Sequence, residues 1–159
     1  MSISKMIFVG FMAVFGCLGN SIMAADMPQG IIKLSANEDG GGKSCALIIR
    51  EGTAVQNFYM GNTACANDEA RYFALENVPS ATLIRFDDSP CDKYADQYMF
   101  TIKTIVHPTE TRRIGLRELK DARVDSIIVR GVQLVKKENE GGFQDGKLSC
   151  VKVWRSALP

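Results

Sequence analysis

The stretch that decides the fold class is Gln97-Tyr-Met-Phe-Thr-Ile-Lys-Thr-Ile-Val106, the longest run of β-branched and aromatic residues after the N-terminal segment. Such residues favour extended strands, and the run stops at His107-Pro108, because proline cannot donate to a strand ladder. Shorter runs of the same kind lie on both sides of it, separated by polar turns. They predict strands at 46–50, 55–60, 71–75, 81–86, 113–116, 126–129, 132–135 and 147–154.

Strands at this spacing are typical of an antiparallel β-sandwich or barrel. No stretch keeps a 3.6-residue hydrophobic repeat, which argues against a helical fold, and one helical turn is expected at 118–122. We predict one β domain over residues 45–159, with a first hairpin after residue 45 and a terminal hairpin around 138–142. Residues 26–44 are polar and glycine-rich and predict a flexible N-terminal arm, in which 30–34 could add a short strand.

Residues 1–25 have the pattern of an export signal. Lys5 precedes an uncharged apolar run over 6–18, and the small residues Ala24 and Ala25 fit a signal-peptidase site. A retained membrane anchor needs roughly 20 apolar residues, whereas glycine and polar residues dilute this run. We therefore predict a cleaved signal peptide and a periplasmic or secreted protein that is free of the membrane after cleavage.

Cysteine usage fits an oxidising compartment. Cys17 lies in the signal segment, where a lipoprotein attached through it stays open as an alternative. The four cysteines left after cleavage form an even set in an exported chain, which indicates two disulfides. Four cysteines allow three connectivities, and we predict the pairs Cys45–Cys65 and Cys91–Cys150. The first would lie near the open end of the first hairpin, and the second would tie the middle of the chain to its last strand.

The charge of the mature chain is balanced. Lys5 is the only charged residue in the signal segment, so the 19 basic residues of the whole chain fall to 18, equal to the 18 acidic ones. Nucleic acids and anionic membranes need a clustered basic surface. The balance therefore argues against both and leaves a protein or a carbohydrate as the expected partner.

An internal repeat suggests a family. The segment 75–85 resembles 119–130, and Phe58-Tyr-Met-Gly61 precedes the first copy. Together they resemble the βγ-crystallin-like family, whose motifs carry an aromatic residue and a glycine in an early hairpin and a serine before an apolar strand. The resemblance implies an antiparallel Greek-key sandwich of two such motifs. The residues that would take these roles are Phe58, Gly61, Ser80 and Ser126.

The same resemblance implies a calcium site, because the family often binds calcium through two Asn/Asp residues, two variable positions, then Ser/Thr and Ser. This chain offers Glu76-Asn77-Val-Pro-Ser80-Ala81, so Asn77 and Ser80 are the candidate metal ligands, and calcium is the candidate cofactor. Calcium takes six to eight oxygen ligands, and this loop departs from the pattern at both of its ends. Turn-forming roles for Asn77 and Ser80 stay open as the alternative.

The sequence predicts no catalytic residue. His107 is the only histidine and precedes a proline, the cysteines are assigned to disulfides, and the carboxylates are scattered over turns. We therefore expect an exported, non-enzymatic binding or structural module of crystallin-like type. The alternative is a protein-directed inhibitor or immunity protein that acts through the glycine-rich loops 39–43 and 140–146. Trp154 and other aromatic residues could add a face that contacts sugar or protein.

Overall fold

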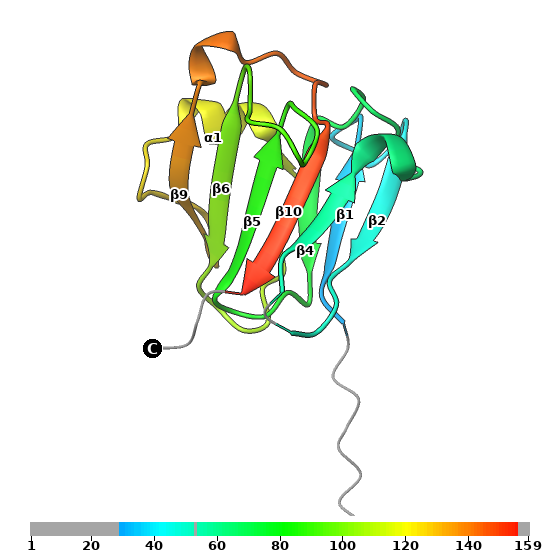
Figure 1. Cartoon of the computed structure of the whole chain (residues 1–159). Helices are drawn as coiled ribbons and strands as arrows, with labels where there is room; N and C mark the ends of the chain where they lie inside the picture. Colours follow the sequence, from blue (N-terminus) through cyan, green and yellow to red (C-terminus); the bar gives the residue numbers. More distant parts are fainter. Residues whose placement is uncertain (1–28, 53, 156–159) are drawn as a thin grey trace, which may run out of the picture.

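Alternating burial along short strands builds two antiparallel sheets that pack face to face. In β5 (Thr82–Asp87), Ile84 and Phe86 are buried in the core, and Arg85 between them points to the outer face. The computed structural model describes residues 29–52 and 54–155 (Figure 1). Over these residues the predicted all-β antiparallel sandwich is confirmed.

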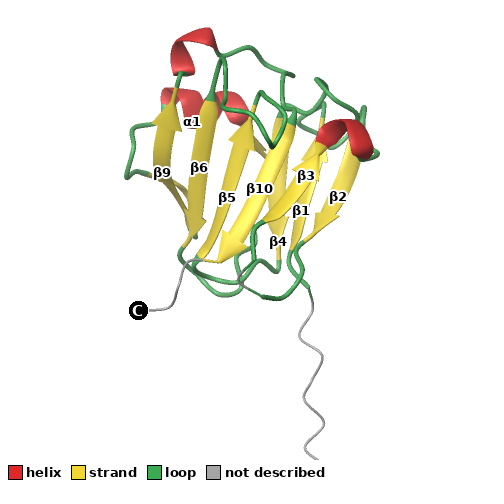
Figure 2. Cartoon of the chain, viewed as in Figure 1, coloured by secondary structure: helices red, strands yellow, loops and turns green. Residues whose placement is uncertain are grey.

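The smaller sheet has the strand order β2-β1-β4-β7, and the larger sheet has the order β3-β10-β5-β6-β9-β8 (Figure 2). The strands of the smaller sheet are β1 (Ile31–Ser35), β2 (Ser44–Ile48), β4 (Tyr72–Glu76) and β7 (Ile114–Gly115). Those of the larger sheet, besides β5, are β3 (Gln56–Tyr59), β6 (Met99–Thr104), β8 (Ile127–Val129), β9 (Val132–Glu138) and β10 (Cys150–Arg155). The helical elements are η1 (Met60–Asn62), α1 (Leu116–Asp121) and η2 (Glu140–Gly142). None of the described helices is long and apolar enough to cross a bilayer.

The core lies between the two sheets. Phe73 on β4 and Phe86 on β5 meet across the interface with ring centroids 4.6 Å apart, and both are fully buried. A second aromatic group closes one end of the sandwich, where Tyr98 stacks on Phe100 at 5.1 Å and Phe143 packs against both. Each ring belongs to a different strand or loop, so the core joins segments far apart in the sequence.

Each strand predicted from the sequence overlaps a strand of the structure, and the helical turn predicted at 118–122 corresponds to α1. Within the arm predicted at 26–44, the short strand left open at 30–34 corresponds to β1, which lies in the interior of the smaller sheet. Two fully buried side chains, Ile32 and Leu34, hold this strand in the core. Residues 36–43 form the turn that joins β1 to β2, and the signal segment 1–25 lies outside the described residues.

Both predicted hairpins are wrong. β2 pairs with β1 and β3 pairs with β10, so the two strands of the expected first hairpin belong to different sheets. β1, whose residues were assigned to the arm, pairs with one side of β2, whereas β3 pairs with β10 and leaves the other side of β2 as the edge of the smaller sheet. At the other end of the chain, β9 pairs with β6 and β8, whereas β10 inserts between β3 and β5. The last strand therefore lies inside the larger sheet and not beside the strand that precedes it.

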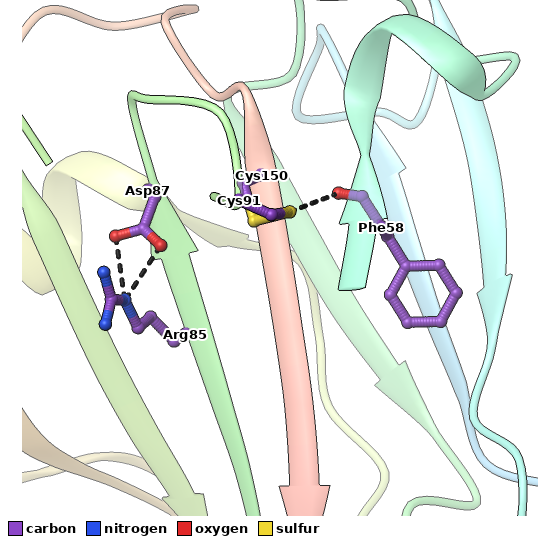
Figure 3. Close-up of a disulfide and its surroundings, with 5 residues drawn as sticks. All are labelled: Phe58, Arg85, Asp87, Cys91 and Cys150. Atoms are coloured by element: carbon purple, nitrogen blue, oxygen red, sulfur yellow. Dashed lines mark hydrogen bonds and ion pairs between the residues drawn. A yellow bond between two sulfur atoms is a disulfide. The ribbon is translucent and has the colours of Figure 1, made fainter. Parts of the chain in front are cut away.

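The predicted cysteine pairing is confirmed. Cys45 on β2 is bonded to Cys65 in the loop after η1, and Cys91 in the β5–β6 loop is bonded to Cys150 at the start of β10. The sulfur of Cys91 lies 3.6 Å from the carbonyl oxygen of Phe58 on β3 (Figure 3). The two bridges thus link the loops at one end of the sandwich to both sheets.

Tyr98 carries a polar atom that the core does not satisfy. Its hydroxyl is buried without a hydrogen-bond partner among the described residues, and burial together with the carboxylate of Asp88 raises the pKa of the phenol. We expect Tyr98→Phe to raise the free energy of unfolding by about 1 kcal/mol, because it removes an unsatisfied buried hydroxyl and keeps the stacked ring. Urea unfolding at pH 7 measures this. A loss of stability in Tyr98→Phe would show that the hydroxyl has a partner in solution.

Candidate functional site

One end of the sandwich contains a pocket between strand ends and loops. The end of β2, the start of β1, the end of β10 and the loops after β4 and β6 surround a pocket of about 370 Å³. This is the lower end of the molecule in Figure 1, where β1 begins and β10 ends. We call it the strand-end pocket, and it is lined by Gln29, Gly30, Ile49, Arg50, Glu51, Gly52, Asn77, Pro79, His107 and Arg155.

Backbone contacts fix the walls of the pocket. Ile49 donates its amide hydrogen to the carbonyl oxygen of Gly30 at 2.8 Å, which holds the beginning of β1 against the end of β2. A Cβ atom on Gly30 would lie 3.2 Å from both the Pro79 ring and the Val78 backbone, so this close approach favours glycine. The amide of Gln56 bonds both backbone groups of Arg50, at 2.8 and 2.9 Å, and pins the chain beyond β2. The scaffold of the pocket is therefore ordered on two sides.

The charged lining of the pocket is mostly cationic. Arg50 and Arg155 have no ion pair within 4.0 Å among the described residues, and Glu51 is the one carboxylate of the lining that the structure describes. His107, the single histidine of the chain, adds an imidazole from the loop after β6. Guanidinium groups without a carboxylate partner are suited to donate hydrogen bonds to carboxylate or phosphate oxygens of a ligand.

Comparison with known proteins identifies no relative of this chain. No family model matches the chain, and no curated protein and no solved structure matches it either. The function therefore has to be inferred from the residues of the site and their surroundings.

The two residues predicted as calcium ligands lie in one loop, between β4 and β5. Asn77 has a positive φ of 52° and donates its backbone N–H to the carboxylate of Glu110 at 2.7 Å, and it lines the strand-end pocket. Ser80 is half-buried in the same loop, while the neighbouring carboxylate of Glu76 is paired with Lys33. The described residues contain no group of three or more His, Cys, Asp or Glu side chains that could hold a metal ion. The calcium site stays a prediction.

The other positions named from the crystallin resemblance lie apart from the pocket. Phe58 is half-buried on β3, Gly61 lies in η1, and Ser126 precedes β8, where its hydroxyl donates to the Arg123 carbonyl oxygen at 2.6 Å. The second copy of the proposed repeat differs from the first, because Leu119 lies on α1 where the first copy has a strand residue. Membership of the crystallin-like family stays a prediction as well.

Of the residues that line the pocket, the sequence analysis singled out Asn77 as a candidate ligand, whereas it assigned no role to His107 or to the two arginines. Arg50 and Arg155 each end or follow an apolar strand, where a basic residue is ordinary. Their convergence depends on β2 and β10 ending at the same end of two facing sheets. With both predicted hairpins wrong, no signal in the sequence could have brought the two residues together.

Proposed function

We propose that this protein is an exported, non-enzymatic binding module that takes an anionic group of its ligand into the strand-end pocket. The observation that carries the proposal is a concave site of about 370 Å³ with two guanidinium groups, on Arg50 and Arg155, that have no ion pair over residues 29–52 and 54–155. This volume falls in the range of small-molecule sites, roughly 300–1,000 Å³. The two disulfides support an oxidising, exported compartment, and a periplasmic or secreted location is part of the proposal.

The chemistry of the lining favours binding over catalysis. Nucleophilic catalysis needs a hydroxyl or thiol within hydrogen-bond reach of a base, and the described lining offers neither beside His107. Glycoside hydrolysis needs two carboxylates that flank the same bond of the substrate. Glu51 is the single carboxylate of the lining that the structure describes. A set of two arginines, one imidazole and two side-chain amides, beside the single carboxylate of Glu51, instead resembles a site that recognises an anion by charge-assisted hydrogen bonds.

Titration calorimetry with citrate as the probe tests the proposal. We expect saturable binding to the oxidised protein and at least a tenfold weaker affinity in Arg155→Gln, because a hydrogen bond to a charged group is worth about 1.5–3 kcal/mol. Arg123→Gln is the matched control, since Arg123 is exposed and lies outside the pocket. Equal citrate affinity in the wild type and in Arg155→Gln would refute the pocket as the binding site.

A further inference from the structure

The outer face of the larger sheet carries a set of basic side chains that the strand-end pocket does not use. Opposite residues of antiparallel strands point to the same face of a sheet, so the register identifies which side chains share it. Figure 2 shows no helix across the front of β5, β6 and β10. We call it the basic face, and it is formed by Arg85, Lys103, Lys136, Lys152 and Trp154.

The register places three of these cations in one row. Lys152 on β10 is opposite Arg85 on β5, Arg85 is opposite Thr101 on β6, and Thr101 is opposite Lys136 on β9. Three inter-strand steps of about 4.8 Å make this row roughly 14 Å long. In the next row, Leu83 lies between Trp154 and Lys103. The charges thus form a flat array with an aromatic ring at its border.

Two of the four cations on the basic face have no ion pair within 4.0 Å among the described residues, although the charge of Lys152 also acts on the carboxylate of Asp87. Arg85 is paired with Asp87 at 2.8 Å and Lys136 with Glu138 at 2.7 Å. Lys103 and Lys152 have no ion pair within the part of the chain that the structure describes. The net charge of the mature chain is balanced, so the excess of positive charge on this face is local. Such a face is complementary to an acidic partner.

Aromatic residues surround the same face. Trp154 is half-buried beside Leu83, Tyr59 is 37 % exposed on the neighbouring β3, and Tyr94 is 67 % exposed. The Tyr94 hydroxyl donates to the Glu138 carboxylate at 3.0 Å, which holds this loop residue at the rim of the sheet. Indole and phenol rings offer apolar surfaces next to polar groups, on which the C–H faces of sugar rings can pack.

We propose that the basic face binds an acidic polysaccharide, with its carboxylate or sulfate groups on Lys103 and Lys152 and a sugar ring against Trp154. A protein partner is less well matched, because the centre of a protein interface is depleted in charge whereas charged residues occupy the middle of this face. Duplex nucleic acid needs many phosphate contacts, and Lys103 and Lys152 on a neutral chain supply few. This site is separate from the strand-end pocket and does not depend on its ligand.

Binding of the oxidised protein to heparin and to polygalacturonate tests this, with neutral dextran as the uncharged comparison. We expect both acidic polymers to bind and dextran not to bind. In Lys103→Glu/Lys152→Glu the affinity should fall at least tenfold, because attraction at two sites becomes repulsion. Trp154→Ala should weaken both polymers, and the charge-reversal pair keeps the test valid if that variant does not fold.

The control is Lys43→Glu/Arg123→Glu, which changes the net charge equally at two exposed residues outside the face. It should bind the polymers within about twofold of the wild type, and a loss equal to that of the face variant would overturn the proposal. Capture of an acidic protein or of duplex DNA, without either polysaccharide, would overturn it too. Arg155→Gln should leave polymer binding unchanged, so failure of the citrate site and failure of the basic face are distinguishable.

Discussion

Replacing Cys91 and Cys150 together by alanine is expected to lower the free energy of unfolding by about 4 kcal/mol. The bridge joins residues 59 positions apart, and a cross-link across a loop of that length removes a large part of the conformational freedom of the unfolded chain. Both cysteines are buried, and Cys150 begins β10, which is hydrogen-bonded to β3 on one side and β5 on the other. The folded state can keep these contacts without the bridge, so the effect falls mainly on the unfolded state.

Urea unfolding at pH 7 measures this loss, with Cys45→Ala/Cys65→Ala as the comparison. That second bridge spans 20 positions, and the same chain-entropy argument gives about 3 kcal/mol. If loop length determines the contribution of each disulfide, the variant without Cys91–Cys150 loses more free energy of unfolding than the variant without Cys45–Cys65. A larger loss in the Cys45/Cys65 variant would mean that native contacts of β2, and not loop length, determine what each disulfide contributes.

The positions of the strands along the chain were predictable because strand formation depends on local composition. The run at 97–106 became β6, and the shorter apolar runs became strands close to their predicted positions. Pairing partners were not predictable in the same way. A short strand at 30–34 was left open within the arm, but its place between β2 and β4, with Ile32 and Leu34 buried in the core, was not predicted.

The candidate sites depend on that long-range pairing, so they were largely hidden in the sequence. In the sequence, nothing distinguishes Lys103 and Lys152 from other solvated lysines. The register of β5, β6 and β10 places both on one face of the larger sheet. The predicted disulfides were confirmed even though the hairpin used to argue for Cys45–Cys65 does not exist. That pairing holds because β2 and the loop after η1 are brought together by both sheets.

Arg85→Met is expected to lower the free energy of unfolding by about 3–4 kcal/mol at pH 7, because it leaves a buried carboxylate without its cation. The Asp87 side chain is 2 % exposed, and both of its oxygens accept from Nε of Arg85, at 2.9 and 2.8 Å (Figure 3). Lys136→Met is the matched control, because its partner Glu138 is also two residues further along the same strand but is 28 % exposed. Loss of that exposed pair should cost no more than about 1 kcal/mol.

The pH dependence identifies the buried charge as the cause. Burial raises the pKa of Asp87 above its ordinary 3.8, and removing the Arg85 guanidinium, which lowers it, should raise that pKa further. A carboxyl whose pKa is higher in the folded state binds more protons there, so stability falls as pH rises from the unfolded pKa through the folded one. The deficit of Arg85→Met relative to the wild type should therefore shrink as pH is lowered through the folded pKa.

Adding Asp87→Asn to Arg85→Met should recover at least about half of the loss at pH 7. A deficit that is constant with pH and unchanged by Asp87→Asn would instead assign the loss to the packing of the Arg85 side chain on the sheet.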